Sequence, residues 1–213
     1  MGLSQLQERV ARSFFALPES AGFALAGGAA LVVQRLVDRT TRDLDFFGPE
    51  QLAARRAADA LQAALVAGGL HCERVRDHAT FVRLAVADGD QITEVDVCYD
   101  HQWRPSVPTA VGPARSPEEL AVDKLLALYG RALPRDFVDV YRLHQICGIE
   151  AMMRWAPEKD RGFSGYRLAE TLGTMARFRR AEFEIDDDSY ADLETFFAGL
   201  RAELIRRTVE EGR

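Results

Sequence analysis

The fold of this chain is built around residues 43–47, which read Asp43-Leu44-Asp45-Phe46-Phe47. The stretch begins by alternating polar and apolar residues, which is the period of a β-strand. Leu44 and Phe46 are therefore expected to point into a core. Asp43 and Asp45 then project together from the other face, about 7 Å apart along the chain. Acidic pairs are common at strand ends, so this pair needs support from elsewhere in the sequence before it indicates a site.

The elements around this strand predict a mixed α/β region. Upstream, an amphipathic helix is expected at residues 4–17, a short strand at 23–26 and a helix at 29–37. Downstream, the composition of residues 50–67 favours a helix, and three further strands are expected at 73–75, 80–87 and 92–99. The turn Asp88-Gly89-Asp90 between the last two strands indicates a β-hairpin.

The second half of the chain reads as helical. The Pro-rich stretch from Trp103 to Pro117 is interpreted as a linker or crossover. Ser116 and Glu119 have the spacing of a capping box, with Pro117 at the first helical position. Helices are then expected near 117–130, 135–147, 149–156, 164–180 and 188–209. The predicted fold class is α+β: a mixed α/β region over residues 1–105, then a helical region over residues 116–213.

A third acidic residue strengthens the case for a site. Asp96 lies in Glu94-Val95-Asp96-Val97-Cys98 and is flanked by apolar residues on another predicted strand. If that strand lies beside residues 43–47, three carboxylates converge, and they cannot all stay ionised without a cation. Carboxylate oxygens suit Mg²⁺, which also binds substrate phosphates. The alternative is that Asp96 is an ordinary edge residue of a hairpin.

Two glycines mark a second candidate feature. Gly27-Gly28 stands at a predicted strand-to-helix turn, where the backbone can approach a phosphate and the helix dipole favours an anion. A plain turn is the competing interpretation. Neither a Walker-A pattern nor a GxGxxG pattern is present.

Composition limits the class of protein. The 213 residues are 47% hydrophobic and 28% charged, which is typical of one large globular domain or two small ones. The net charge of −6 argues against nucleic-acid binding over the whole surface, although it leaves room for a local basic groove. No apolar run is long enough to span a bilayer, and no secretory signal is expected at the N-terminus. The three cysteines (Cys72, Cys98 and Cys147) are widely spaced, which favours a reducing cytoplasm.

Two blocks of sequence carry a family resemblance. The first is Gly27-Gly28-Ala29-Ala30-Leu31, followed by Arg39-Thr40-Thr41-Arg42-Asp43-Leu44-Asp45-Phe46. The second is Leu120-Ala121-Val122-Asp123-Lys124-Leu125-Leu126-Ala127-Leu128, followed by Arg131 and Arg135-Asp136-Phe137-Val138-Asp139-Val140-Tyr141. In this order the blocks resemble the signatures of the AbiEii/AbiGii-type nucleotidyltransferase toxins, a group that includes the mycobacterial MenT toxins. The resemblance covers about residues 20–145.

The resemblance implies a fold and an activity. The fold would be a polymerase-β-like nucleotidyltransferase domain with a mixed sheet, followed by a helical C-terminal region that completes the active-site cleft. The activity would be that of a growth-inhibiting, Mg²⁺-dependent toxin. It would transfer nucleotides from an NTP, a pyrimidine such as CTP or UTP, to the 3′ acceptor end of tRNA and so block translation. A cognate antitoxin is the implied partner; the sequence does not indicate the oligomeric state.

The resemblance also implies roles for single residues. Asp43 and Asp45 would bind the metal, with Asp96 as third ligand on the evidence of its strand. Lys124 would bind the nucleotide phosphates. Gly27, Gly28 and Arg39 would also belong to the nucleotide-binding site.

Two further roles follow from the same resemblance. Asp136 would be the essential acid of the second block, orienting either Lys124 or the acceptor hydroxyl. Thr41 occupies a position where a hydroxyl is phosphorylated by the partner antitoxin in some relatives. A phosphate there would place negative charge beside the metal acids and block nucleotide or Mg²⁺ binding.

Other functions remain open at this point. An enzyme of the same fold could modify a small molecule or a protein hydroxyl, and a catalytically silent member could act by binding alone. A kinase-type enzyme ranks last because its Gly-rich loop is missing. Two arginine groups have two interpretations each, solvated surface or phosphate contact: Arg131, Arg135 and Arg142 with Asp139, and Arg177, Arg179 and Arg180 near Phe178.

Overall fold

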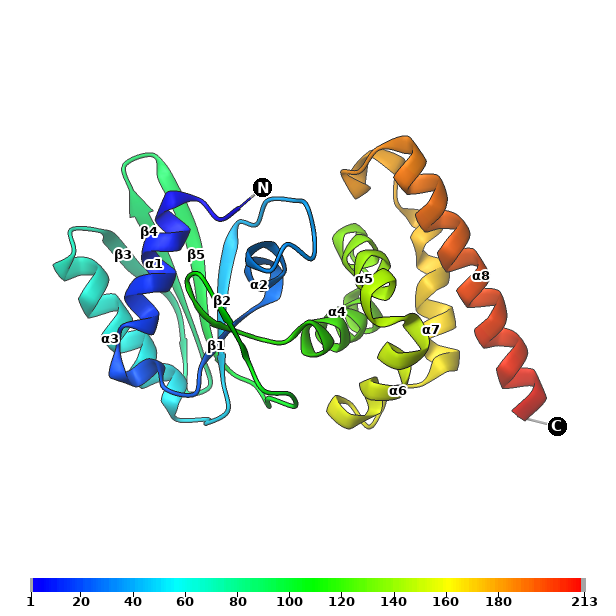
Figure 1. Ribbon diagram of the computed structural model, residues 1–213, viewed down its shortest axis with the longest axis horizontal. Helices are drawn as coiled ribbons and strands as arrows, with labels where there is room; N and C mark the ends of the chain where they lie inside the picture. Colours follow the sequence, from blue (N-terminus) through cyan, green and yellow to red (C-terminus); the bar gives the residue numbers. More distant parts are fainter. Residues whose placement is uncertain (1, 212–213) are drawn as a thin grey trace. The chain divides into compact units, whose positions relative to one another are not determined.

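The computed structural model describes residues 2–211 and confirms a mixed α+β fold. The chain divides into two compact units, Met1–Leu120 and Ala121–Arg213 (Figure 1). The division falls inside one helix, α4 (Pro117–Arg131). The first unit contains all the strands of the described chain, and the second is helical throughout.

The first unit is a seven-stranded mixed sheet with helices. Its strands are β1 (Ala24–Ala26), β2 (Asp43–Gly48), β3 (His71–His78), β4 (Phe81–Asp88), β5 (Gln91–Tyr99), β6 (Val107–Thr109) and β7 (Gly112–Ala114), in the order β3-β4-β5-β2-β1-β7-β6. Its helices are α1 (Gln5–Phe15), a 3₁₀ turn at Pro18–Ser20, α2 (Gly27–Val33) and α3 (Ala53–Ala67). Strands β2 and β5 are parallel neighbours, as are β1 and β7, and the other pairs are antiparallel.

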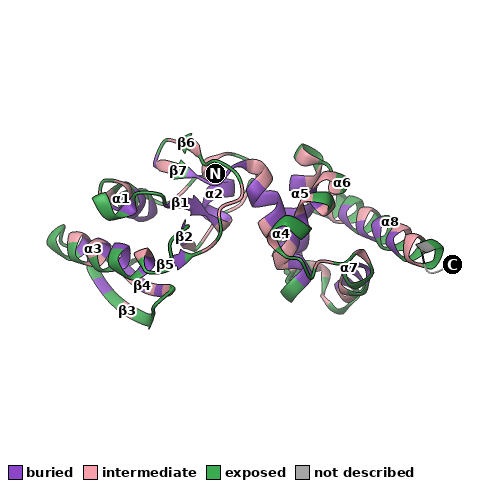
Figure 2. Ribbon diagram, turned by 90° about the horizontal axis from the view of Figure 1, so that it is seen from below, coloured by how far each residue is buried: buried purple, intermediate pink, exposed green. Residues whose placement is uncertain are grey.

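One face of this sheet is packed by α1 and α3 (Figure 1). Leu44 and Phe46 are completely buried on that face, as the alternation in the sequence predicts. The ring of Phe46 stacks on Phe14 of α1 with centroids 4.0 Å apart. Figure 2 shows β1 buried along its length and β3, at the sheet edge, largely exposed. Burial of alternate β2 residues therefore leaves Asp43 and Asp45 on the opposite face.

The stretch predicted as a linker contains structure that the sequence did not indicate. β6 and β7 form a small antiparallel hairpin there, with Pro108 opposite Pro113. Each strand has three residues, of which one is a proline, and is therefore too short to show the alternation of polar and apolar residues that predicts a strand. The helix start at Ser116 is as predicted, because its hydroxyl accepts the Glu119 N–H at 3.2 Å. The Glu119 carboxylate turns away and accepts the backbone N–H groups of Trp103 and Arg104.

The second unit is a helical bundle around aromatic side chains. It contains most of α4, then α5 (Pro134–Cys147), α6 (Ile149–Lys159), α7 (Gly165–Leu172) and α8 (Asp187–Glu211), with 3₁₀ turns at Gly173–Arg177 and Arg180–Phe183. Phe137 of α5 lies at its centre and contacts the rings of Phe178, Phe183 and Phe197.

The predicted helix over 164–180 is wrong beyond Leu172. The chain leaves the α-helix at Gly173, and Phe178 is extended. Gly173, a residue of low helix propensity, stands where the α-helix ends, and the 3₁₀ turn that follows carries the buried Met175. Asp186 then begins α8 by accepting the Ser189 N–H at 2.8 Å.

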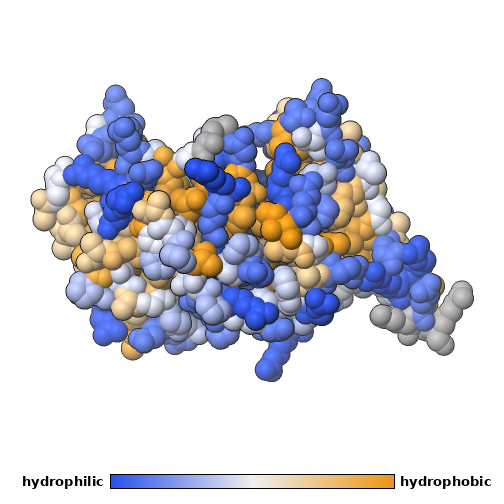
Figure 3. Space-filling model, viewed as in Figure 1, coloured by the Kyte–Doolittle hydropathy of each residue, from blue (hydrophilic) through white to orange (hydrophobic). Residues whose placement is uncertain are grey.

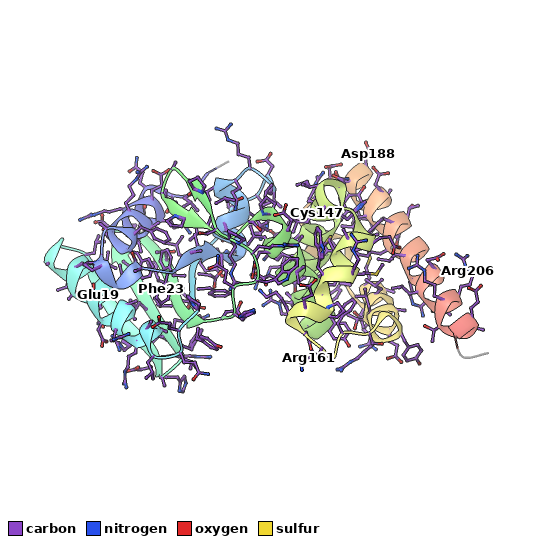
Figure 4. The ribbon with its side chains drawn as sticks, turned by 60° about the horizontal axis from the view of Figure 1, so that its bottom comes forward. Glu19, Phe23, Cys147, Arg161, Asp188 and Arg206 are labelled. Carbon is purple, nitrogen blue, oxygen red and sulfur yellow. The ribbon has the colours of Figure 1, made fainter. Side chains whose placement is uncertain are left out.

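The ends of the two units can be followed in the remaining views. In Figure 4, Phe23 lies at the entry to β1, and Asp188 and Arg206 lie towards opposite ends of α8. The end of α8 beside the grey C-terminal residues is covered mostly by hydrophilic side chains (Figure 3).

Candidate active site

Three acidic side chains lie on one face of the sheet in the first unit. Because β2 and β5 are parallel neighbours, Asp45 is the register partner of Asp96, and Asp43 is the partner of Glu94. Paired residues of neighbouring strands point to the same face. Asp43 and Asp45 are half-buried, whereas Asp96 is only 7% exposed. The strand with Asp96 therefore lies beside the acidic pair, which is the condition on which the sequence argument depended.

Thr41 holds the first of these acids. Its hydroxyl donates a hydrogen bond to Oδ1 of Asp43 at 2.9 Å. A neutral donor fixes the direction of the carboxylate and leaves its negative charge in place. Asp43 is thus oriented and still able to attract a cation.

The start of α2 lies directly against the acids. Gly27 has a φ of +58°, and a Cβ built on it would stand 1.8 Å from Oδ2 of Asp45. A Cβ on Gly28 would stand 2.8 Å from the Thr41 hydroxyl and 3.2 Å from Nη2 of Arg39. Side chains therefore cannot be added at these glycines without moving the acids or their neighbours. The structure brings these predicted residues into one place.

Asp96 has a cationic partner that the sequence analysis missed. Arg83 of β4 donates from Nε to Oδ1 of Asp96 at 2.7 Å and from Nη2 to Oδ2 at 2.6 Å. These hydrogen bonds raise the pKa of Arg83 above its ordinary value. The hairpin register could have revealed the pair, because counting outward from the turn at Asp88–Gln91 sets Arg83 opposite Asp96.

The acids also affect a neighbouring thiol. Cys98 lies two residues after Asp96 on β5, and burial raises its pKa, with a further rise from the carboxylates of Asp96 and Asp45. The thiol therefore stays protonated at neutral pH and is an unsuitable nucleophile.

Asp43 and Asp45 fit a divalent metal ion. They offer hard oxygen donors on one strand, beside a backbone cradle that a Cβ would fill. Within residues 2–211, no three His, Cys, Asp or Glu side chains are grouped so as to hold a metal ion. On this face, Arg83 engages both oxygens of Asp96. Its assignment as the third ligand stays a prediction.

Lys124, in the second unit, forms a buried ion pair. Its Nζ lies 3.0 Å from Oδ2 of Asp139, whose side chain is completely buried. The chain's other lysine, Lys159, pairs with Asp123 in the same unit. Both lysines of this arginine-rich chain thus serve in pairs with little exposure of the ammonium group, where a compact cation is useful.

Asp139 was placed on a possible solvated face by the sequence analysis, and the structure corrects this. It is 0% exposed, within the apolar run Phe137 to Val140. Apolar flanks were the signal that singled out Asp96, and the same signal applied to Asp139 would have predicted its burial.

Asp136 pairs with an arginine of the same unit. It is also completely buried, and its carboxylate accepts Nε and Nη2 of Arg131 at 2.9 and 2.8 Å. It accepts the Leu133 N–H at 3.1 Å as well, at the start of α5. The acid that orients Lys124 is therefore Asp139. The role of Asp136 as essential acid stays a prediction.

The second unit also contains a small pocket. It has a volume of about 270 Å³ and is lined by Tyr129, Gly130, Arg131, Ala132, Thr171, Thr174, Arg177 and Phe178. Of the predicted basic cluster, only Arg177 lines it. Arg180 pairs with Asp187, and Arg179 lies 3.8 Å from Glu182.

The chain matches a known protein family. Residues 10–211 match the family described as nucleotidyl transferase AbiEii toxin, type IV toxin–antitoxin system. No curated protein matches the chain. No helix within residues 2–211 is long and apolar enough to cross a membrane.

Several solved structures share the fold. MenT4, a nucleotidyltransferase toxin of Mycobacterium tuberculosis H37Rv, is 19% identical, with a TM-score of 0.63 over 94% of this chain and 86% of that one. JHP933 of Helicobacter pylori is 15% identical, with a TM-score of 0.53 over 99% and 98%. The antibiotic-resistance factor ANT(2″)-Ia has a TM-score of 0.50 over 83% and 100%, at 14% identity. The match along nearly the whole sequence shows that the chain belongs to the AbiEii family of nucleotidyltransferase toxins, which act in type IV toxin–antitoxin systems.

Proposed function

We propose that this toxin is an Mg²⁺-dependent enzyme that transfers nucleotides from CTP or UTP to the 3′ acceptor end of tRNA in the cytoplasm. The observation that carries the proposal is the acidic pair Asp43 and Asp45 against the side-chain-free start of α2. In the transfer, the acceptor hydroxyl loses its proton to solvent and its oxygen bonds to the α-phosphorus, while the bond from the α-phosphorus to the oxygen bridging to the β-phosphate breaks and pyrophosphate leaves.

The residues of the first unit fit the needs of this reaction. A divalent ion held by Asp43 and Asp45 would neutralise the triphosphate and the leaving pyrophosphate. Thr41 keeps Asp43 pointed into the site. Gly27 and Gly28 allow the phosphates to approach the backbone, and the nearby Arg39 adds positive charge.

The helical region would complete the cleft and contribute Lys124 as a ligand of the nucleotide phosphates. The ion pair with the buried Asp139 supports this role, because it fixes the orientation of the Lys124 ammonium group. Asp136 is the proposed essential acid, and it would act together with Arg131, which it holds by two hydrogen bonds.

The pocket of the second unit supports an RNA acceptor. It combines the arginines Arg131 and Arg177 with the rings of Tyr129 and Phe178. Guanidinium groups attract the phosphate backbone of RNA, and aromatic rings stack on unpaired bases such as those at an acceptor end.

Regulation by phosphorylation of Thr41 is part of the proposal. The antitoxin partner that the family implies would add a phosphate to this hydroxyl. Since the hydroxyl lies 2.9 Å from a carboxylate oxygen of Asp43, the added negative charge would repel both the acid and the incoming triphosphate.

A second candidate is nucleotide transfer to a small molecule. The net charge of −6 favours it over a large polyanion, and the fold is shared with an antibiotic-resistance factor. The acceptor is what distinguishes the two candidates, because the metal and nucleotide sites would be the same.

The test is a labelling experiment. Purified wild-type protein and Asp43→Ala are incubated with Mg²⁺, total tRNA and each labelled NTP in turn. Label entering tRNA from CTP or UTP with the wild type alone is the expected result. Label that enters a small molecule supplied in place of tRNA, with tRNA itself unlabelled, would refute the tRNA acceptor and favour the second candidate.

A further inference from the structure

A row of charged side chains crosses three neighbouring strands on the acidic face. Asp45 of β2 is the register partner of Asp96 of β5, which in turn is the partner of Arg83 of β4. The guanidinium group of Arg83 therefore lies on the same face of the sheet, two strands from Asp45.

The guanidinium group of Arg83 uses the whole carboxylate of Asp96. Nε donates to one oxygen of Asp96 at 2.7 Å, and Nη2 donates to the other at 2.6 Å. The third nitrogen, Nη1, lies 3.1 Å from Oε2 of Glu94. The side chains of Arg83 and Asp96 are 28% and 10% exposed, so water screens the pair only partly. Charge-assisted, two-pronged contacts of this length are among the strong hydrogen bonds of proteins.

Asp43 is held in a contrasting way. Its partner is the neutral hydroxyl of Thr41, which occupies one oxygen and leaves the charge uncompensated by that contact. A hard cation gains most from carboxylates whose charge is not already neutralised. Asp96 would have to break two strong hydrogen bonds to become a metal ligand.

We infer that Arg83 takes the place of a second metal ion. It neutralises Asp96, and the site binds a single divalent cation through Asp43 and Asp45. The inference deepens the proposed function and rests on it. Arg83 is a positioning residue, which acts through Asp96 and supplies a permanent positive charge beside the acidic pair.

The experiment titrates the full-length protein with Mn²⁺ alone and counts bound ions by electron paramagnetic resonance. Wild type is expected to bind one ion. Asp96→Asn should retain it with affinity within about twofold, since Asp96 is not a ligand, whereas Asp45→Asn should weaken it more than about tenfold. Thermal melts establish that each variant is folded.

Removal of the arginine gives the second arm. In Arg83→Gln the carboxylate of Asp96 is released, so a second Mn²⁺ is expected to bind, or the first to bind about tenfold more tightly. The gain should vanish in the double variant Arg83→Gln/Asp96→Asn. Arg74→Gln is the control, because Arg74 forms an ion pair with Asp59 in the same unit, and it should leave Mn²⁺ binding unchanged.

The outcomes separate this inference from the proposed function. Loss of an ion in Asp96→Asn, or unchanged binding in Arg83→Gln, would overturn the role of Arg83 and leave the Asp43–Asp45 site intact. If Asp45→Asn binds Mn²⁺ as the wild type does, the metal site of the proposed function is wrong, and the inference fails with it.

Discussion

The two units of this protein treat their carboxylates differently. On the sheet face, Asp43 and Asp45 remain half-buried, and Asp43 is oriented by a neutral hydroxyl. In the helical unit, Asp136 and Asp139 are completely buried, and each is paired with a cation of the same unit. A buried ion pair holds a geometry, while a partly exposed acid keeps its charge for a ligand. We therefore expect loss of function without unfolding from the first group, and loss of stability from the second.

The largest expected effect is that of Asp45→Asn. The change keeps the size of the side chain and removes its charge, so binding at the proposed metal site should weaken while the packing of β2 is preserved. Nucleotide transfer should fall about a thousandfold, equivalent to about 4 kcal/mol of transition-state stabilisation. Labelled-nucleotide incorporation and a urea unfolding curve measure the two properties. A large drop in unfolding free energy would mean that Asp45 is structural, which would break the comparison.

Asp139→Asn tests the buried acids of the helical unit. It leaves the Lys124 ammonium without its anionic partner in a site where that ammonium has little contact with water. The free energy of unfolding should fall by about 3 kcal/mol. The matched control is Asp88→Asn, which removes an ion pair with Arg9 whose side chains are about half exposed, and it should cost well under about 1 kcal/mol. Equal effects in the two variants would contradict the distinction between buried and exposed pairs.

Substitutions of Thr41 sharpen the comparison at the sheet face. Thr41→Glu places a negative charge next to Asp43 and should reduce nucleotide transfer about a hundredfold. Thr41→Val removes only the hydrogen bond and should reduce it about fivefold. The measurement is the Mg²⁺ dependence of transfer by both variants. Full activity of Thr41→Glu would remove phosphorylation of this residue as an off switch.

The smallest expected effect is a pH dependence in the helical unit. His144 of α5 stacks on Phe196 with ring centroids 3.9 Å apart, and burial lowers its pKa from 6.5. The unfolded chain therefore binds this proton more readily than the folded one, so stability is lost as the pH falls below 6.5. The free energy of unfolding, measured with urea at several pH values below 6.5, should fall less steeply with decreasing pH in His144→Phe than in wild type. The exposed His71→Gln is the control, and an unaltered slope in His144→Phe would refute the assignment.

Much of the sheet site follows from local pattern. Alternation over Asp43–Phe47 gives the face of each side chain, and the hairpin turn after Asp88 gives the register of β4 on β5. The pairing of β2 with β5 joins residues about 50 positions apart in the chain. Both strands were predicted, but the sequence alone does not show that they are neighbours in the sheet. The pairing of Arg83 with Asp96 could have been predicted from the register of this hairpin, but it was overlooked.

The helical region was less predictable for physical reasons. Side chains on different helices meet through tertiary packing, so the pairing of Lys124 with Asp139 has no signature in spacing along the chain. The α-helix ends at Gly173, but a single glycine within a helical pattern is tolerated, so the sequence does not mark this end.

The contact between Gly27 and Asp45 has a genetic consequence. Even one methyl group at Gly27 would fall within 1.8 Å of the Asp45 carboxylate, so every amino-acid replacement there displaces the acid. Cells that express a toxin survive by inactivating it, and most inactivating substitutions in a protein act by unfolding it. Gly27 belongs to a rarer class, because its replacement disturbs the site at the surface of an intact sheet. Among clones that escape growth arrest and still accumulate folded toxin, substitutions of this glycine, alanine included, should recur.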